Sequence, residues 1–241
     1  MKRLFKEYHN YLLLLLIIIV FSISLISISY YNSKHSLIKD ITKLNLFNVD
    51  TLIIVSHPSD ETLWTSSRLI KENCLVVCLS CTNNKETTEF IKTLNYTDDL
   101  YLTLEYPEYK DNTRINWNTY KKDISKDIKK ILNTKRWTTI ITHNPNGEYG
   151  NIHHKLISNI VTENTNNKDI LYYFQEYHSK KDISNYYDYL LKLDPNILQT
   201  KYYLLSNYNS KDYILDSYSH IIPYEELIPY RKWGEIDETN K

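Results

Sequence analysis

The sequence predicts an α/β protein with a Rossmann-like, mainly parallel sheet flanked by helices, preceded by one N-terminal transmembrane helix. Three observations predict this fold class. From Val49 onward, short runs of β-branched and aliphatic residues alternate with segments of helical periodicity, which is the order of a parallel sheet. The run 51–56 is almost entirely aliphatic or β-branched, as in a strand buried on both faces. Residues 11–31 contain no charged side chain.

The uncharged stretch 11–31 is long enough for a membrane anchor, since about 20 apolar residues of helix span a bilayer core. A cleaved signal peptide is the alternative, but the apolar run is long and no Ala-x-Ala-like site follows it. Lysines lie on both sides of the stretch, so the positive-inside rule gives no orientation. The predicted domains are a basic flank at 1–10, the anchor at 11–31, a linker at 32–48 and one catalytic domain at 49–241.

Within the domain, strands and helices are predicted to alternate. Ser59 is placed to cap the first helix, whose first turn holds Asp60 and Glu61, where acidic groups suit the positive helix end. Asp194-Pro195 opens a later helix, because proline favours the first helical position. The predicted strands are 51–56, 74–80, 100–104, 138–142, 170–174 and 202–206. The predicted helices are 60–72, 86–94, 118–133 and 155–163, and an acidic, proline-bearing loop is predicted at 105–112.

The composition excludes some functions and sites. With 29 basic and 29 acidic residues and no basic stripe, the chain lacks the footprint of a nucleic-acid-binding protein. Cys74, Cys78 and Cys81 fall on one predicted strand, and an odd number without a framework predicts buried reduced thiols, not disulfides. Of only three glycines, Gly147 and Gly150 lie in one short loop, which indicates a positive φ or a close backbone approach there.

A metal site is predicted where the first and fourth strands end. His57 and Asp60 lie three positions apart across a strand-to-helix turn, and an imidazole with a carboxylate suits zinc. The alternative is a solvated turn whose aspartate only favours the helix N-terminus. The fourth strand ends at the same sheet edge in a loop that reaches His153 and His154, and His154 completes a three-ligand site with a position open for water.

Two motifs resemble those of the PIG-L/LmbE-like zinc de-N-acetylases. The first is the family's His-Pro-Asp-Asp-Glu after a strand, which reads His57-Pro58-Ser59-Asp60-Glu61 here. The second is its Thr-His-Asn-Pro-x-Gly-Glu-Tyr-Gly-His-x-x-His loop, which corresponds to Thr142 through His154. The resemblance covers the chain from Thr51 to Val161 and implies an LmbE-like fold.

The resemblance implies an enzyme that binds Zn²⁺, or another divalent metal, at His57, Asp60 and His154. Such an enzyme removes the N-acetyl group from an N-acetylglucosaminyl lipid of the GlcNAc-phosphatidylinositol type, a step of GPI anchor biosynthesis, or from a related amino sugar. A single-pass membrane protein at the endoplasmic reticulum or another internal membrane is implied as well. The expected partners are an N-acetylated amino-sugar or glycolipid substrate and a membrane, while the sequence identifies no protein partner.

The catalytic residues depart from the family pattern. Ser59 stands where the family has its aspartate base, and Asn151 stands where it has the histidine thought to stabilise the oxyanion. The family's substrate-binding arginine after the second strand is absent, with Glu86 near its place. Serine cannot accept a proton near neutral pH, and losing a positioned base costs about 100- to 10,000-fold in rate. Glu61 and His153 are the candidates for a replacement base.

These departures leave two alternatives open. In the first, the chain is a catalytically impaired member of the family that keeps the metal and the fold for binding a sugar or a partner protein. In the second, it keeps the fold without a metal. In the last case His57 and His154 are ordinary polar lining.

Overall fold

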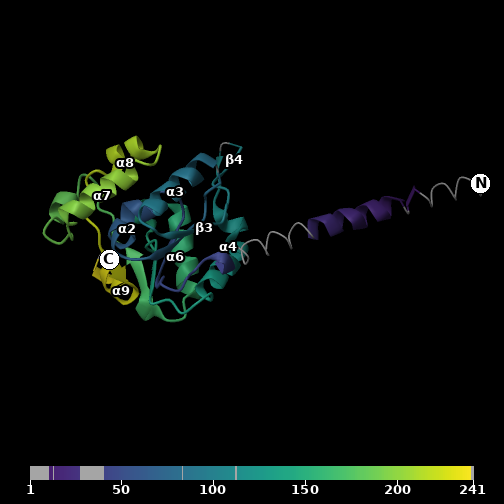
Figure 1. The fold of residues 1–241 in the computed structure, drawn as a ribbon, viewed down its shortest axis with the longest axis horizontal. Coiled ribbons are helices and arrows are strands. Elements are labelled where there is room, and N and C mark those ends of the chain that lie inside the picture. Colours follow the sequence, from purple (N-terminus) through teal and green to yellow (C-terminus); the bar gives the residue numbers. More distant parts are fainter. Residues whose placement is uncertain (1–10, 13, 28–40, 83, 112, 240–241) are drawn as a thin grey trace, which may run out of the picture. The chain divides into compact units, whose positions relative to one another are not determined.

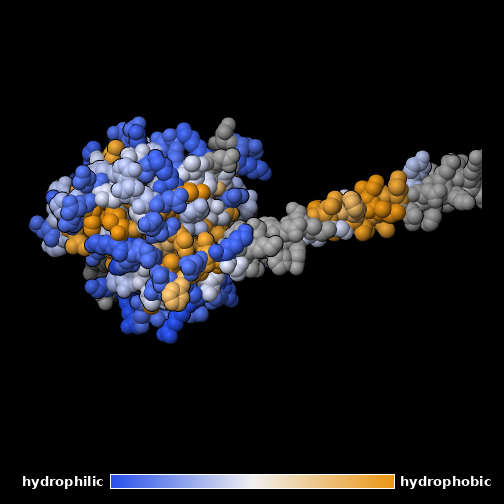
Figure 2. Space-filling view, viewed as in Figure 1, coloured by the Kyte–Doolittle hydropathy of each residue, from blue (hydrophilic) through white to orange (hydrophobic). Residues whose placement is uncertain are grey.

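The computed structural model describes residues 11–12, 14–27, 41–82, 84–111 and 113–239, and the chain divides into two compact units, Met1–Lys43 and Leu44–Lys241. In the first unit, residues 11–12 and 14–27 are helical, and Figure 2 shows this segment as largely hydrophobic. Among the described residues no helix is both long enough and apolar enough to cross a membrane, so the predicted transmembrane helix is not supported. Parts of the predicted anchor, at 13 and 28–31, lie outside the described residues, as do the basic flank 1–10 and the linker residues 32–40.

The second unit is built on a six-stranded sheet with the strand order β3-β2-β1-β6-β7-β8 (Figure 1). Its first five strands run parallel, and the edge strand β8 is antiparallel to β7. The predicted mainly parallel sheet is therefore confirmed. The strands are β1 Thr51–Val55, β2 Cys74–Cys78, β3 Leu100–Thr103, β6 Thr139–Thr142, β7 Leu171–Phe174 and β8 Leu227–Pro229.

Helices cover both faces of this sheet, as Figure 1 shows. On one face, apolar residues of α2, α3, α7 and α8 form a buried core with alternate residues of the strands, while α4 and α6 pack against each other. Every residue of β1 and β2 is buried, which agrees with their aliphatic composition. The helices are α2 Asp60–Lys71, α3 Asn84–Tyr96, α4 Lys121–Leu132, α5 Gly147–Gly150, α6 Ile152–Asn164, α7 Pro195–Leu205, α8 Lys211–Tyr218 and α9 Tyr230–Thr239.

The predicted strand 202–206 is wrong, because α7 continues through Leu205. A short apolar run does not distinguish a strand from a buried helix. The buried residues Ile197, Lys201, Leu204 and Leu205 lie at positions i, i+4, i+7 and i+8, which places them on one face of a helix. The sheet edge is formed instead by β8, whose Pro229 is tolerated because an edge strand can lack one backbone donor.

Two further details differ from the sequence-based expectations. The loop predicted at 105–112 contributes to a small hairpin of β4, Tyr109–Lys110, and β5, Thr113–Arg114. Strand β2 ends at Cys78, so Cys81 lies in the following loop and not on the strand. All three cysteines are free and buried, which confirms the prediction of reduced thiols.

Candidate metal centre

The candidate site lies where β1 and β6 end side by side. These strands pair in parallel with Ile54 opposite Thr142, so the loops that follow them leave the same edge of the sheet. His57 lies two residues after the end of β1, Asp60 is the first residue of α2, and His154 lies in the first turn of α6. The fold thus brings together three side chains that are up to 97 positions apart in the chain.

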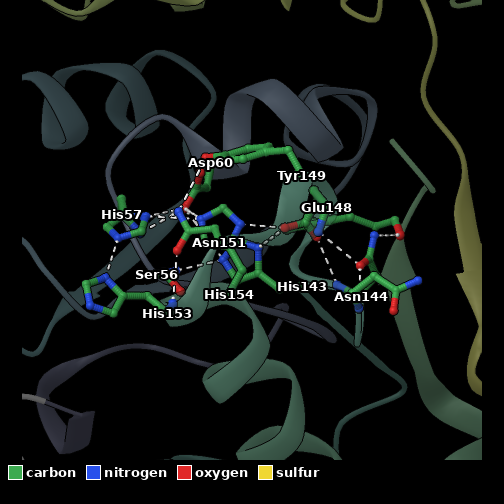
Figure 3. A network of polar contacts seen from close by, with 12 residues as sticks. Ser56, His57, Asp60, His143, Asn144, Glu148, Tyr149, Asn151, His153 and His154 are labelled. Atoms are coloured by element: carbon green, nitrogen blue, oxygen red, sulfur yellow. Dashed lines mark hydrogen bonds and ion pairs between the residues drawn. The ribbon is translucent and has the colours of Figure 1, made fainter. Parts of the chain in front are cut away.

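The three side chains present one atom each to a common centre (Figure 3). His57 Nδ1 lies 3.1 Å from His154 Nε2 and 3.2 Å from Asp60 Oδ2, and the last two atoms are 3.3 Å apart. Ligand atoms of a tetrahedral zinc ion bound at about 2.0 Å are separated by about 3.3 Å. The size and the chemistry of this donor set therefore fit a zinc ion.

Charge at the centre favours a cation. Burial raises the pKa of Asp60, but the charges of His154 and His57 and hydrogen bonds with both outweigh it and hold the pKa well below its usual value. Burial lowers the pKa of His154, but Asp60 and Glu148 outweigh it and raise the pKa to about 9. A proton and a metal ion would compete for the same place, so metal binding there should release protons.

Glu148 holds His154 from the side opposite the centre. Its Oε2 accepts hydrogen bonds from Nδ1 of His154 at 2.5 Å and from Nδ1 of His143 at 3.1 Å, and its Oε1 accepts one from the backbone N–H of Asn144. Burial raises the pKa of Glu148, but His143 and His154 lower it to about 2. The carboxylate stays ionised and holds the Nδ1 proton of His154, so a metal ion that displaced the other proton would meet the lone pair on Nε2, which is the usual support of a metal-ligating histidine.

His143 supports the same ligand through stacking. Its ring lies on that of His154 with centroids 3.8 Å apart, and its Nε2 accepts the backbone N–H of Ser56. Neither His143 nor Glu148 was predicted from the sequence as a site residue. The sequence feature that could have indicated Glu148 is the pair of glycines on either side of it, in the loop that leads to His154.

The turn at Gly147 explains why glycine is needed in this loop. Gly147 has φ +65°, and a Cβ there would lie 2.8 Å from Cγ of Lys155 and 3.2 Å from its backbone nitrogen. Glu148 itself has φ +51°, in the left-handed region that non-glycine residues rarely adopt. This conformation places the buried Glu148 carboxylate between its two histidines.

Ser59 occupies the position before α2, but it does not cap the helix as predicted. Its φ is +81° and its side chain makes no capping hydrogen bond. The Asp60 carboxylate instead accepts a hydrogen bond from the backbone N–H of His57 at 2.9 Å, and this bond stabilises the turn between β1 and α2. Ser59 lines the cavity beside the triad.

Asn151 also lines the cavity, and its side chain caps α6. Its Oδ1 accepts the backbone N–H of His153 at 2.9 Å, and its Nδ2 donates to the hydroxyl of Tyr149 at 3.4 Å. Figure 3 shows Tyr149 next to Asp60 and Asn151. Tyr149 and Asn151 both line the cavity beside the triad.

The two candidates for a replacement base lie outside the cavity lining. Glu61 is fully buried, and its Oε1 accepts hydrogen bonds from the hydroxyls of Tyr208 at 2.6 Å and Thr62 at 2.7 Å. Burial raises the pKa of Glu61 to about 7. His153 is fully buried against Trp117, and burial lowers its pKa to about 4. Their assignment as bases stays a prediction.

The cavity has a volume of about 490 Å³, and two of the three triad residues, His57 and Asp60, line it. Arg114 of β5 lies in its lining, with Nη2 3.1 Å from Glu108 Oε1 and 3.5 Å from Asn151 Oδ1. An arginine therefore does reach the cavity, from β5 and not from the loop after the second strand, where the resemblance places it. Glu86 lines the cavity as well.

His57, Glu108 and His153 form a second group that could hold a metal by distance alone. Arg114 argues against that use, because its Nη2 lies 3.3 Å from His57 Nε2 and 3.1 Å from Glu108 Oε1. A guanidinium remains charged at all ordinary pH values and repels a cation at this position. The triad of His57, Asp60 and His154 is the better candidate.

Comparison with known proteins shows a viral relative. No family model matches the chain. The chain is similar to uncharacterized protein L374 of Acanthamoeba polyphaga mimivirus, with 29% identity over 180 residues, which cover 67% of this chain and 75% of the relative.

Proposed function

We propose that the unit Leu44–Lys241 binds a divalent metal, zinc in the first place, and hydrolyses the amide of an N-acetylated amino sugar. The substrate expected from the motifs is an N-acetylglucosaminyl lipid of the GlcNAc-phosphatidylinositol type. One observation carries the proposal: the ligand atoms of His57, Asp60 and His154 lie 3.1 to 3.3 Å from one another around a common centre.

The residues around the triad suit amide hydrolysis. A bound zinc ion would polarise the amide carbonyl and lower the pKa of a water molecule. The hydroxyl of Tyr149 is a hydrogen-bond donor for negative charge that develops on the carbonyl oxygen, since burial raises its pKa to about 12 and it keeps its proton at neutral pH. Arg114 and the lining tyrosines offer further donors to a polar substrate.

The weak point of this site is the general base. Ser59 lines the cavity where the related motif has a carboxylate, and a hydroxyl cannot accept a proton near neutral pH. Glu108 lies in the cavity lining, but its Oε1 is paired with Arg114 at 3.1 Å. We therefore propose a slow hydrolase.

Metal content and acetate release test the proposal together. Purified full-length protein is analysed by mass spectrometry for bound metal and then assayed for acetate release from N-acetylglucosaminyl-phosphatidylinositol and from N-acetylglucosamine. We expect one zinc ion per chain, and we expect acetate release to stop after chelation. The His57→Ala variant should lose both the bound zinc and the acetate release. Zinc bound without any acetate release above the chelated control would contradict the hydrolase and leave the metal centre standing.

A catalytically impaired, metal-binding protein is the second candidate. The substitutions at Ser59 and Asn151 favour it, because Asn151 is engaged as a helix cap and Ser59 supplies no base. Such a protein should bind the same sugars in a metal-dependent way, measurable by calorimetry, without turning them over.

The location predicted by the sequence is a separate proposal. We propose that the protein acts at an internal membrane. Fractionation of cells that express either the full chain or a variant without residues 11–31 tests this proposal. Release of the shortened chain into the soluble fraction would support a membrane role for this segment.

A further inference from the structure

His57 has one ring nitrogen toward the triad and one toward a different set of side chains. Its Nε2 lies 3.0 Å from His153 Nδ1. We propose that His153 is a positioning residue of the metal centre: it accepts the proton of His57 Nε2 and so keeps the lone pair of His57 on Nδ1, which faces the metal. This inference rests on the metal centre of the proposed function.

The hydrogen bond on the far side of His153 fixes the direction of the proton. His153 Nε2 lies 2.6 Å from the carbonyl oxygen of Ile115, which can only accept. Nε2 of His153 must therefore carry the proton, and in a neutral ring its Nδ1 is then an acceptor. The proton between the two histidines consequently belongs to His57 Nε2.

The other neighbours of His57 Nε2 do not replace this acceptor. Arg114 Nη2 lies 3.3 Å away, but a guanidinium has only donors. Glu108 Oε1 is 3.7 Å away, beyond the range of a hydrogen bond. Among the described residues, His153 is thus the acceptor within reach of this proton.

Packing locks the ring of His153 in the required orientation. Trp117 stacks on it with centroids 4.0 Å apart and an interplanar angle of 7°, and the Trp117 indole N–H donates to the carbonyl of Pro107 at 2.8 Å. The backbone N–H of His153 is held by Asn151. Both ring nitrogens are engaged and the ring lies outside the cavity lining, so His153 acts through His57 and not on a substrate.

Metal-ligating histidines usually give their second N–H to a carboxylate, a backbone carbonyl or water. In this protein the second imidazole, that of His153, occupies that place. The Ile115 carbonyl orients the His153 ring, and the His153 ring in turn orients His57. The segment of Pro107 to Trp117, which is remote in sequence from all three ligands, thereby sets the tautomer of one of them.

Two substitutions separate the hydrogen bond from the packing. His153→Asn keeps an acceptor near the position of Nδ1, whereas His153→Phe keeps the ring on Trp117 and removes the acceptor. His178→Phe is the matched control, because His178 is also stacked on an aromatic ring, at 3.7 Å from Tyr186, but lies outside the site.

The test measures Zn²⁺ affinity of the full-length protein by competition with a chromophoric chelator, with circular dichroism to verify folding. We expect His153→Phe to raise the Kd about 10- to 100-fold, the usual effect of losing such a partner, and His153→Asn and His178→Phe to stay close to the wild type. Nitrogen NMR of the metal-free protein should show His57 protonated on Nε2 in the wild type and a mixture of tautomers in His153→Phe.

The possible failures are distinguishable. No zinc binding by the wild type would overturn the metal centre and this inference together. Normal binding by a folded His153→Phe would overturn the role of His153 alone. Equal weakening in His153→Asn, which keeps an acceptor, and in His153→Phe would show that proton acceptance is not what His153 provides, and would also overturn it.

Discussion

Glu148 Oε2 lies 2.5 Å from Nδ1 of His154, and this contact directs the opposite nitrogen of the imidazole toward Asp60. The carboxylate is fully enclosed and accepts a second histidine proton from His143. The triad is therefore held on one side by Glu148 and on the other by His153, and substitutions outside the ligand set should change metal binding.

Glu148→Gln should weaken zinc binding about 10- to 100-fold while the protein stays folded. The amide has nearly the same shape, but its NH₂ group would face the N–H of a histidine or of Asn144, because Glu148 accepts on both oxygens. Competition with a chelator measures the change. Glu163→Gln, an exposed position on α6, is the control and should bind as the wild type. Unchanged affinity in Glu148→Gln would contradict the supporting role.

Ser59→Asp should raise the rate of acetate release about 100- to 10,000-fold, because it restores a base in the cavity without touching a ligand. The left-handed φ of +81° at this position is tolerated by aspartate and asparagine better than by most residues. Ser59→Asn is therefore the matched control, with the same shape and no base. Steady-state kcat/KM is the measurement, and equal rates for the two variants would refute the missing-base explanation.

The buried Glu61 should make the metal-free protein less stable as the pH rises. Its pKa is about 7 in the folded protein against an ordinary value of 4.5, so its carboxyl contributes no penalty below pH 4.5 and the full penalty above pH 7. The difference corresponds to about 3 kcal/mol. Urea unfolding in the presence of a chelator measures the free energy of unfolding of Glu61→Gln and of the wild type at pH 5 and at pH 8. From pH 5 to pH 8, Glu61→Gln should gain up to this amount relative to the wild type. A gain that does not depend on pH would contradict the titration of Glu61.

Lys201→Met should destabilise the fold by about 3 kcal/mol, because it leaves a buried carboxylate without its cation. Lys201 on α7 is fully buried, and its Nζ lies 3.2 Å from Glu225 Oε2. Glu225 also accepts the hydroxyl of Ser66 on α2, so this pair ties α7 to the helix that carries Asp60. The midpoint of urea unfolding measures the loss, and the exposed Lys211→Met serves as the control. A change below about 1 kcal/mol, the size expected for a surface pair, would contradict the claim that Lys201 and Glu225 form a stabilising buried ion pair.

The sequence alone determined the mainly parallel sheet and the place where its chemistry gathers. The aliphatic runs of β1, β2 and β6 and the helical periodicity between them predict parallel strands, whose polar ends must share an edge. His57 and Asp60 are close in sequence, and His154 follows the neighbouring strand, so the three could be placed together without coordinates. These signals are local, because each depends on a period or a spacing within one segment.

The tertiary structure decided what surrounds the triad. Glu61 is engaged by Tyr208, which is 147 positions away, and His153 is held by Ile115, 38 positions away, so neither contact is visible in a local pattern. The role of Glu148 depends on a left-handed backbone and on the burial of its side chain together with those of His143 and His154. The apolar run in α7 was compatible with a strand until packing against α2 fixed it as a helix. Periodicity and spacing thus determined the sheet and the candidate ligands, whereas the contacts that support them were decided by packing between segments remote in the chain.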